Sequence, residues 1–77
     1  MNIQPLNPLT NPTDYDQFKM DAESFLLMVD ENQKVPYLIA NIRGDAKKAI
    51  LPRFEEIRNA ETVAAAFEIL DAIFSQR

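Results

Sequence analysis

The chain of 77 residues carries a formal net charge of −4 and contains no cysteine, histidine or tryptophan. These properties exclude disulfides and thiolate metal sites, and they remove the side chains that most often act as general base or nucleophile near neutral pH. An acidic chain is also disfavoured as an autonomous nucleic-acid binder, because phosphate binding needs clustered cations.

We therefore expect one small domain that is not an enzyme and that holds no cofactor or metal. The N-terminus lacks the basic region and apolar stretch of a signal peptide, and the apolar runs are far too short to span a membrane. These absences favour a cytoplasmic protein without membrane contact.

Residues 1–12 are predicted to form an extended N-terminal arm. They contain three prolines, which lack a backbone donor and push the preceding residue toward extended geometry. Ile3, Leu6 and Leu9 recur every third residue and give the arm one apolar edge. The arm is either a frayed tail or a segment that docks on the helices or on a neighbouring molecule.

Residues 13–77 are predicted to form a helical lobe that begins with an amphipathic helix. This helix starts near Thr13, which with Asp16 resembles a capping box, or at Pro12 with Asn11 as its cap. Apolar residues spaced by three and four define its buried face: Tyr15, Phe18, Ala22, Phe25 and Val29. Three more widen this face near its end: Leu26, Leu27 and Met28. The widening indicates either deep burial or a second surface presented to a partner.

The second helix is predicted over residues 33–43, with Pro36 in its first turn, where a missing N–H is tolerated. The lone glycine, Gly44, is expected to end this helix in the left-handed conformation, because it has no Cβ to clash. Asp45 is expected to cap a third helix, which Pro52 then kinks or breaks.

The fourth helix is predicted over residues 60–76, with Asn59 as its cap. The fold class is therefore all-α: a compact bundle of four to five short helices with an extended N-terminal arm. The predicted core consists of apolar side chains from every helix: Phe18, Phe25, Leu38, Ile42, Ile50, Phe54, Phe67, Leu70 and Phe74.

Neighbouring carboxylates occur at several places, but adjacent side chains on a helix point in different directions, so we interpret them as solvated. The run Asp30, Glu31 and Asn32 is no calcium loop, because it lacks that loop's central glycine and terminal glutamate.

The basic cluster, defined as Arg43, Lys47, Lys48 and Arg53, gathers half of the chain's eight cations near its middle. One interpretation is a solvated face with intrachain partners such as Asp45 and Glu56. The other is a partner-binding surface that meets the acidic start of the first helix of a neighbouring copy. Such opposite charges on two faces of one protomer suit head-to-tail assembly. The acidic start comprises Asp14, Asp16 and Asp21.

Several features recur in the order known from one family. They are the aromatics Tyr15 and Phe18, the pair Phe25-Leu26, the aliphatic Val35, Leu38 and Ile39, the step Ile42-Arg43-Gly44-Asp45-Ala46, and the aromatic-rich end Phe67–Phe74. With them, the lobe resembles the N-terminal lobe of the capsid domain in Gag proteins of gypsy-class LTR retrotransposons and in the related domesticated Arc proteins.

The resemblance implies a structural domain that assembles through protein–protein contacts into a capsid-like shell, or virus-like particle. Its partners would be other copies of the chain or a C-terminal capsid lobe. As an alternative function, the resemblance to Arc implies a module that binds short apolar peptides in a groove framed by the arm and the helices. The residues carried over to that groove are Ile3, Leu6 and Leu9.

Overall fold

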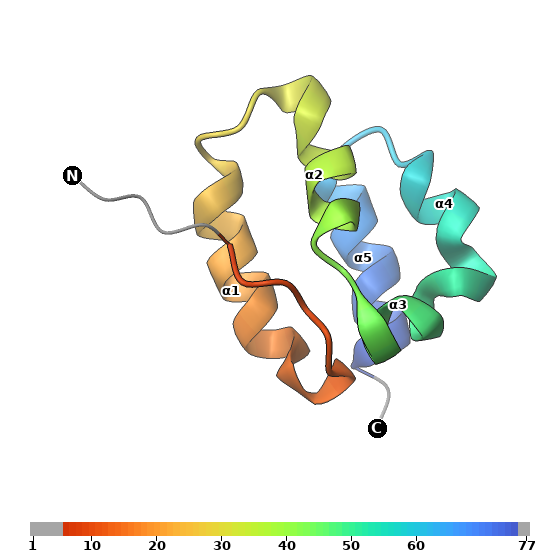
Figure 1. Cartoon of the computed structure of the whole chain (residues 1–77). Coiled ribbons are helices and arrows are strands. Elements are labelled where there is room, and N and C mark those ends of the chain that lie inside the picture. Colours follow the sequence, from red (N-terminus) through yellow and green to blue (C-terminus); the bar gives the residue numbers. More distant parts are fainter. Residues whose placement is uncertain (1–5, 76–77) are drawn as a thin grey trace.

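The structure, a computed structural model, describes residues 6–75 (Figure 1). Within that range it contains five α-helices: α1 (Tyr15–Leu26), α2 (Lys34–Ala40), α3 (Gly44–Ile50), α4 (Phe54–Arg58) and α5 (Val63–Phe74). Three single 3-10 turns precede α1, α2 and α4: η1 (Pro12–Asp14), η2 (Glu31–Gln33) and η3 (Leu51–Arg53). The predicted all-α bundle is thus confirmed.

Helix α5 holds the bundle together. It packs against α2, α3 and α4, and it buries Ala66, Phe67 and Leu70. Stacked aromatic rings join α1 to its neighbours: Tyr15 stacks on Phe74 of α5 with ring centres 4.9 Å apart, and Phe25 stacks on Tyr37 of α2 at 5.2 Å. Helices α1 and α4 consequently lie on opposite sides of the molecule, with α2 and α5 between them (Figure 1).

The start of α1 follows the second of the two predicted alternatives. The Asn11 side chain accepts a hydrogen bond from the backbone N–H of Thr13 at 3.0 Å, and Pro12 opens the turn that leads into the helix. The fixed φ of proline suits this position, and its missing N–H is one that a helix start leaves unpaired in any case.

Two predicted caps are wrong. Asn59 ends α4, and Thr62 instead caps α5 by accepting the N–H of Ala65 on its hydroxyl at 3.1 Å. Asp45 lies in the first turn of α3 without a side-chain capping bond. The carbonyl of Thr10 accepts a hydrogen bond from the N–H of Ala46 at 3.0 Å. The arm therefore supplies an acceptor for one of the N–H groups that the start of a helix leaves unpaired.

Gly44 adopts the predicted left-handed conformation, with φ of 59°. The helix before it is shorter than predicted, because α2 ends at Ala40 and extended backbone at Arg43 precedes the glycine. Pro52 interrupts the next helix as expected: α3 ends at Ile50, and the chain passes through η3 into α4.

Most of the predicted core is buried, but three aromatics are only partly so: Phe25, Phe54 and Phe74. The core also contains residues outside the predicted set: Leu6, Leu9, Tyr15, Ala22, Leu26, Val35, Ala46, Ile57 and Ala66. Two of these come from the arm, which therefore belongs to the hydrophobic core. None of the helices within residues 6–75 is long and apolar enough to cross a membrane.

Candidate interaction surfaces

The arm is seated on the corner between α2 and α3. Leu9 donates its N–H to the carbonyl of Asn41 at 2.7 Å and accepts the N–H of Arg43 at 2.8 Å, which forms a short parallel bridge with Ile42. The side chains of Leu6 and Leu9 are buried, with exposed fractions of 7% and 1%. Both predicted groove residues therefore pack inside their own protomer, while Ile3 lies outside the described residues.

The basic cluster has the intrachain partners that one interpretation expects. Arg53 donates two hydrogen bonds to the Glu56 carboxylate, at 2.9 and 3.2 Å, and these hold the pKa of Glu56 below its ordinary value. The Lys48 ammonium lies 4.0 Å from the Asp45 carboxylate, and Arg43 donates its Nε to the carbonyl of Ala40. Lys47 and Lys48 remain exposed on α3, so the cluster still presents charge to solvent.

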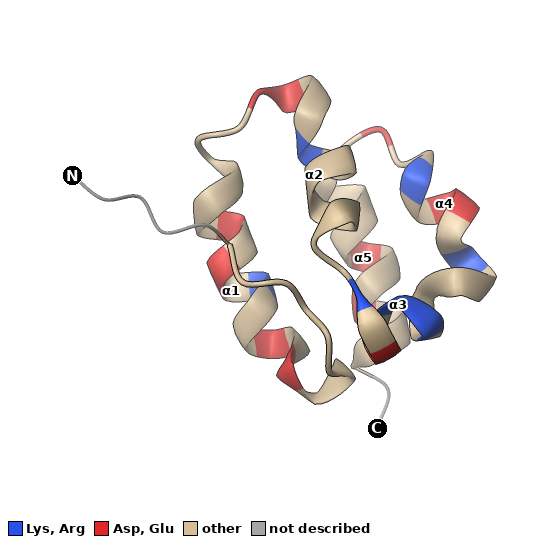
Figure 2. Cartoon of the chain, in the orientation of Figure 1, with Lys and Arg blue, Asp and Glu red and all other residues tan. Residues whose placement is uncertain are grey.

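The acidic residues of α1 lie on the other side of the molecule. Figure 2 marks acidic positions along α1 and basic positions on α3, η3 and α4, across the bundle. Asp14, Asp21 and Glu23 are all exposed. The protomer therefore has one acidic side and one side enriched in cations.

The single cation of α1 is engaged within the protomer. Lys19 binds Asp71 of α5 with its ammonium 2.9 and 3.1 Å from the two carboxylate oxygens, and it lies 5.6 Å from the ring centre of Phe67. Tyr15 donates its hydroxyl to the same carboxylate at 2.5 Å. These contacts fasten α1 to α5 and leave the outward side of α1 acidic.

The three polar groups of this contact shift one another's pKa. Burial, then the hydrogen bond to Asp71, raises the pKa of Tyr15. Burial acts to raise the pKa of Asp71, but hydrogen bonds from Tyr15 and Lys19 outweigh it and hold that pKa below its ordinary value. A carboxylate accepting hydrogen bonds from a buried phenol and an ammonium has a structural role, and nothing in this arrangement activates a nucleophile.

Large apolar side chains are exposed mainly on α1 and just after it. The exposed fractions are 64% for Met20, 81% for Leu27 and 63% for Met28. Of the apolar run that widens the predicted buried face, only Leu26 is buried, so the burial interpretation is wrong for Leu27 and Met28. The physical reason is the helical turn: Leu26 continues the stripe of Tyr15 and Ala22, whereas its neighbours are rotated away from it.

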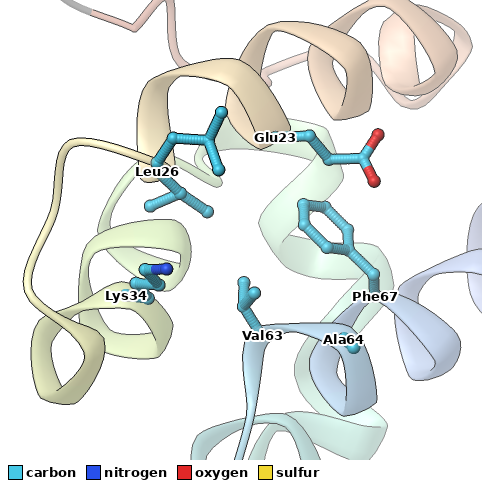
Figure 3. A pocket seen from close by; sticks show the side chains of 7 residues that line it. Glu23, Leu26, Lys34, Val63, Ala64 and Phe67 are labelled. Atoms are coloured by element: carbon cyan, nitrogen blue, oxygen red, sulfur yellow. The ribbon is translucent and has the colours of Figure 1, made fainter.

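A first apolar hollow lies between the end of α1, the start of α2 and the start of α5 (Figure 3). The side chains of Leu26, Val63 and Phe67 converge on it, and Glu23 and Lys34 lie at its edges with opposite charges. Its volume is about 230 Å³. We call it the α1–α5 hollow, and its complete lining is Glu23, Leu26, Leu27, Lys34, Val63, Ala64 and Phe67.

A second hollow lies between α2 and α4 and has a volume of about 420 Å³. Its apolar lining includes Ile39 and Phe54, both of which are half-buried, and its charged residue is Arg58. We call it the α2–α4 hollow, lined by Val35, Pro36, Ile39, Ala40, Phe54 and Arg58. Neither hollow was predicted from the sequence, which places Phe54 in the core.

Within residues 6–75 no group of three or more acidic side chains is placed to hold a metal ion. What this part of the chain presents instead is separated charge, exposed apolar side chains and two apolar hollows, which are features of protein–protein contacts.

Comparisons with protein-family models, with curated proteins and with solved structures found no match to this chain. The class that the fold supports is a small all-α domain.

Proposed function

We propose that this chain is a structural assembly domain, a capsid-like N-terminal lobe whose copies associate head to tail. The observation that carries the proposal is the separation of charge across the bundle (Figure 2). The acidic side of α1 on one copy faces the basic cluster on the next, and complementary potentials both attract the partner and fix its orientation. The order of sequence features shared with Gag capsid lobes supports the same conclusion.

The individual contacts in this proposal are weak. Exposed ion pairs contribute little each, and shells gain their stability from many small contacts made at once. The isolated chain is therefore largely monomeric when dilute and associates as its concentration rises. The proposed partners are other copies of the chain or a C-terminal capsid lobe, in the cytoplasm.

Charge reversal with rescue tests the proposal. Changing Lys47→Glu with Lys48→Glu should weaken concentration-dependent sedimentation at low salt, and so should Asp14→Lys with Asp21→Lys. Combining all four changes restores the original net charge and the attraction, so it should restore association. Thermal unfolding of each variant checks the fold. Association that is unaffected by either reversal would refute the charge-directed model.

A peptide-binding module is the second candidate, and the α1–α5 hollow favours it. Converging apolar side chains with one carboxylate and one ammonium at the edges suit a short apolar peptide (Figure 3). Deletion of residues 1–10 would uncover a second apolar site, the seat of Leu6 and Leu9 at the corner between α2 and α3. If the chain binds peptides, the variant that lacks residues 1–10 should bind apolar peptides more tightly in fluorescence anisotropy. A peptide of residues 1–10 should compete with them for the uncovered site. A change in stability or self-association alone would count against this candidate.

A further inference from the structure

Two exposed apolar side chains form a ridge along α1. Met20 and Leu27 are seven residues apart, which is two helical turns, so they lie on the same side of the helix about 10 Å from each other. Glu23 lies between them on that side and is also exposed. We call Met20, Glu23 and Leu27 the α1 ridge. All three side chains are exposed to solvent, and Glu23 and Leu27 also border the α1–α5 hollow.

The α2–α4 hollow has the complementary properties. Its lining is apolar except for Arg58, whose side chain is 64% exposed. The Arg58 guanidinium lies 3.7 Å from the Glu55 carboxylate, and both groups are open to solvent. Such a pair contributes little stability, so Arg58 can exchange Glu55 for another carboxylate at small cost.

The ridge and the hollow cannot meet within one protomer. Helix α1 lies on one side of the molecule and α4 on the other, with α2 and α5 between them (Figure 1). A contact between these two surfaces therefore needs a second copy of the chain.

We infer that the α1 ridge of one copy docks into the α2–α4 hollow of the next. The inference rests on the proposed head-to-tail association and adds an apolar contact to the one that the basic cluster makes. An acidic helix with apolar anchors at two-turn spacing enters an apolar groove with a cationic edge, which is the usual mode of helix-in-groove recognition. Glu23 of one copy then lies beside Arg58 of the next. The contact is heterologous, so a pair of copies keeps one ridge and one hollow free for further growth.

Two blocked variants test this geometry. The ridge-blocked chain carries Met20→Ser and Leu27→Ser, and the hollow-blocked chain carries Ala40→Gln and Arg58→Glu. All four side chains are exposed, so both chains should fold, which circular dichroism checks. Each variant alone should associate about tenfold more weakly than the unmodified chain, or worse. Mixed together, they should form a one-to-one complex that does not grow, because one intact ridge meets one intact hollow.

The site of binding is read out by NMR. When the isotope-labelled ridge-blocked chain is titrated with the unlabelled hollow-blocked chain, amide shifts should be confined to α2 and α4. Leu51→Ser is the matched control: Leu51 is 55% exposed but belongs to neither surface, so its substitution should leave association unchanged.

The outcomes separate this interface from the proposed function. If the two blocked chains form no complex when they are mixed, the ridge-in-hollow contact is overturned. It is also overturned if the ridge-blocked chain associates as strongly as the unmodified chain. In both cases self-association of the unmodified chain would still support assembly through another surface. An unmodified chain that stays monomeric at every concentration would overturn both proposals.

Discussion

Replacement of Gly44 by alanine tests the corner on which the arm is seated. An ideal Cβ at this position would lie 3.5 Å from the carbonyl oxygen of Thr10 and 3.6 Å from its Cβ, which are ordinary van der Waals distances. The added methyl group therefore fits, and the penalty comes from the backbone. With φ of 59°, an L-residue other than glycine loses about 1–2 kcal/mol.

Part of this loss is offset, because alanine restricts the unfolded chain more than glycine does, by about 0.4–1 kcal/mol. We expect Gly44→Ala to lower the free energy of unfolding by about 1 kcal/mol. For a domain of this size, that shift lowers Tm by about 4–8 °C. Gly44→Asn should lower Tm less, because asparagine tolerates the left-handed region better than alanine.

Chemical and thermal denaturation followed by circular dichroism measures both variants. A raised Tm for Gly44→Ala would show that the corner is not left-handed. A loss above about 4 kcal/mol would exceed the backbone penalty and would mean that the arm packs against this position more closely than van der Waals contact. Either result would refute the reasoning.

Three further predictions concern stability. Leu9→Ala should lower the free energy of unfolding by about 2–5 kcal/mol, because it leaves a cavity at a residue that is 1% exposed. Asn7→Ala, on the exposed side of the arm, should change the free energy of unfolding by less than about 0.5 kcal/mol. If urea denaturation showed equal losses for Leu9→Ala and Asn7→Ala, a docked arm would be contradicted. Thr62→Ala removes the cap of α5 and should lower the free energy of unfolding by about 0.5–2 kcal/mol, whereas Asn59→Ala should lower it less. A larger loss for Asn59→Ala than for Thr62→Ala would indicate that Asn59 is the cap after all. Asp71 binds its proton less tightly in the folded chain than in the unfolded one, so its stabilising contribution is present above about pH 4 and is lost as the pH falls through its lowered folded pKa. The Tm of Asp71→Asn should therefore lie below that of the unmodified chain at neutral pH and approach it in acid, and a constant difference between them would contradict this account.

The sequence was sufficient for the features that depend on local chemistry. Helical spacing predicted the buried residues Tyr15, Phe18 and Ala22 of α1. Pro52 predicted the break after α3, and the lone glycine predicted a left-handed corner. In each case one residue type or one periodicity decides the local conformation without help from distant residues.

The caps were predicted less well, because distant segments change what a helix end needs. Asp45 was the natural cap of α3, but the arm brings the Thr10 carbonyl to the first turn of that helix. The same long-range pairing decides whether the arm docks, since Leu9 binds the backbone of Asn41 and Arg43, more than thirty residues away. No local pattern in residues 1–12 contains that partner.

The candidate surfaces were only partly predictable. The basic cluster was visible as a run of cations, and the exposure of Leu27 and Met28 was one of two alternatives. The α2–α4 hollow was not visible, because its lining combines residues from two helices whose packing is decided by the core. Shape at a surface depends on how helices meet, and periodicity describes only one helix at a time.

Self-association of this chain is the property on which both proposals depend. Sedimentation across a wide range of concentration and salt, with electron microscopy of the densest samples, measures this directly. We expect a monomer in dilute solution, association that grows with concentration and weakens with salt, and rings, sheets or shells in the densest samples. A monomer at every concentration would contradict both proposals, and stable oligomers in dilute solution would contradict the weak contacts on which they depend.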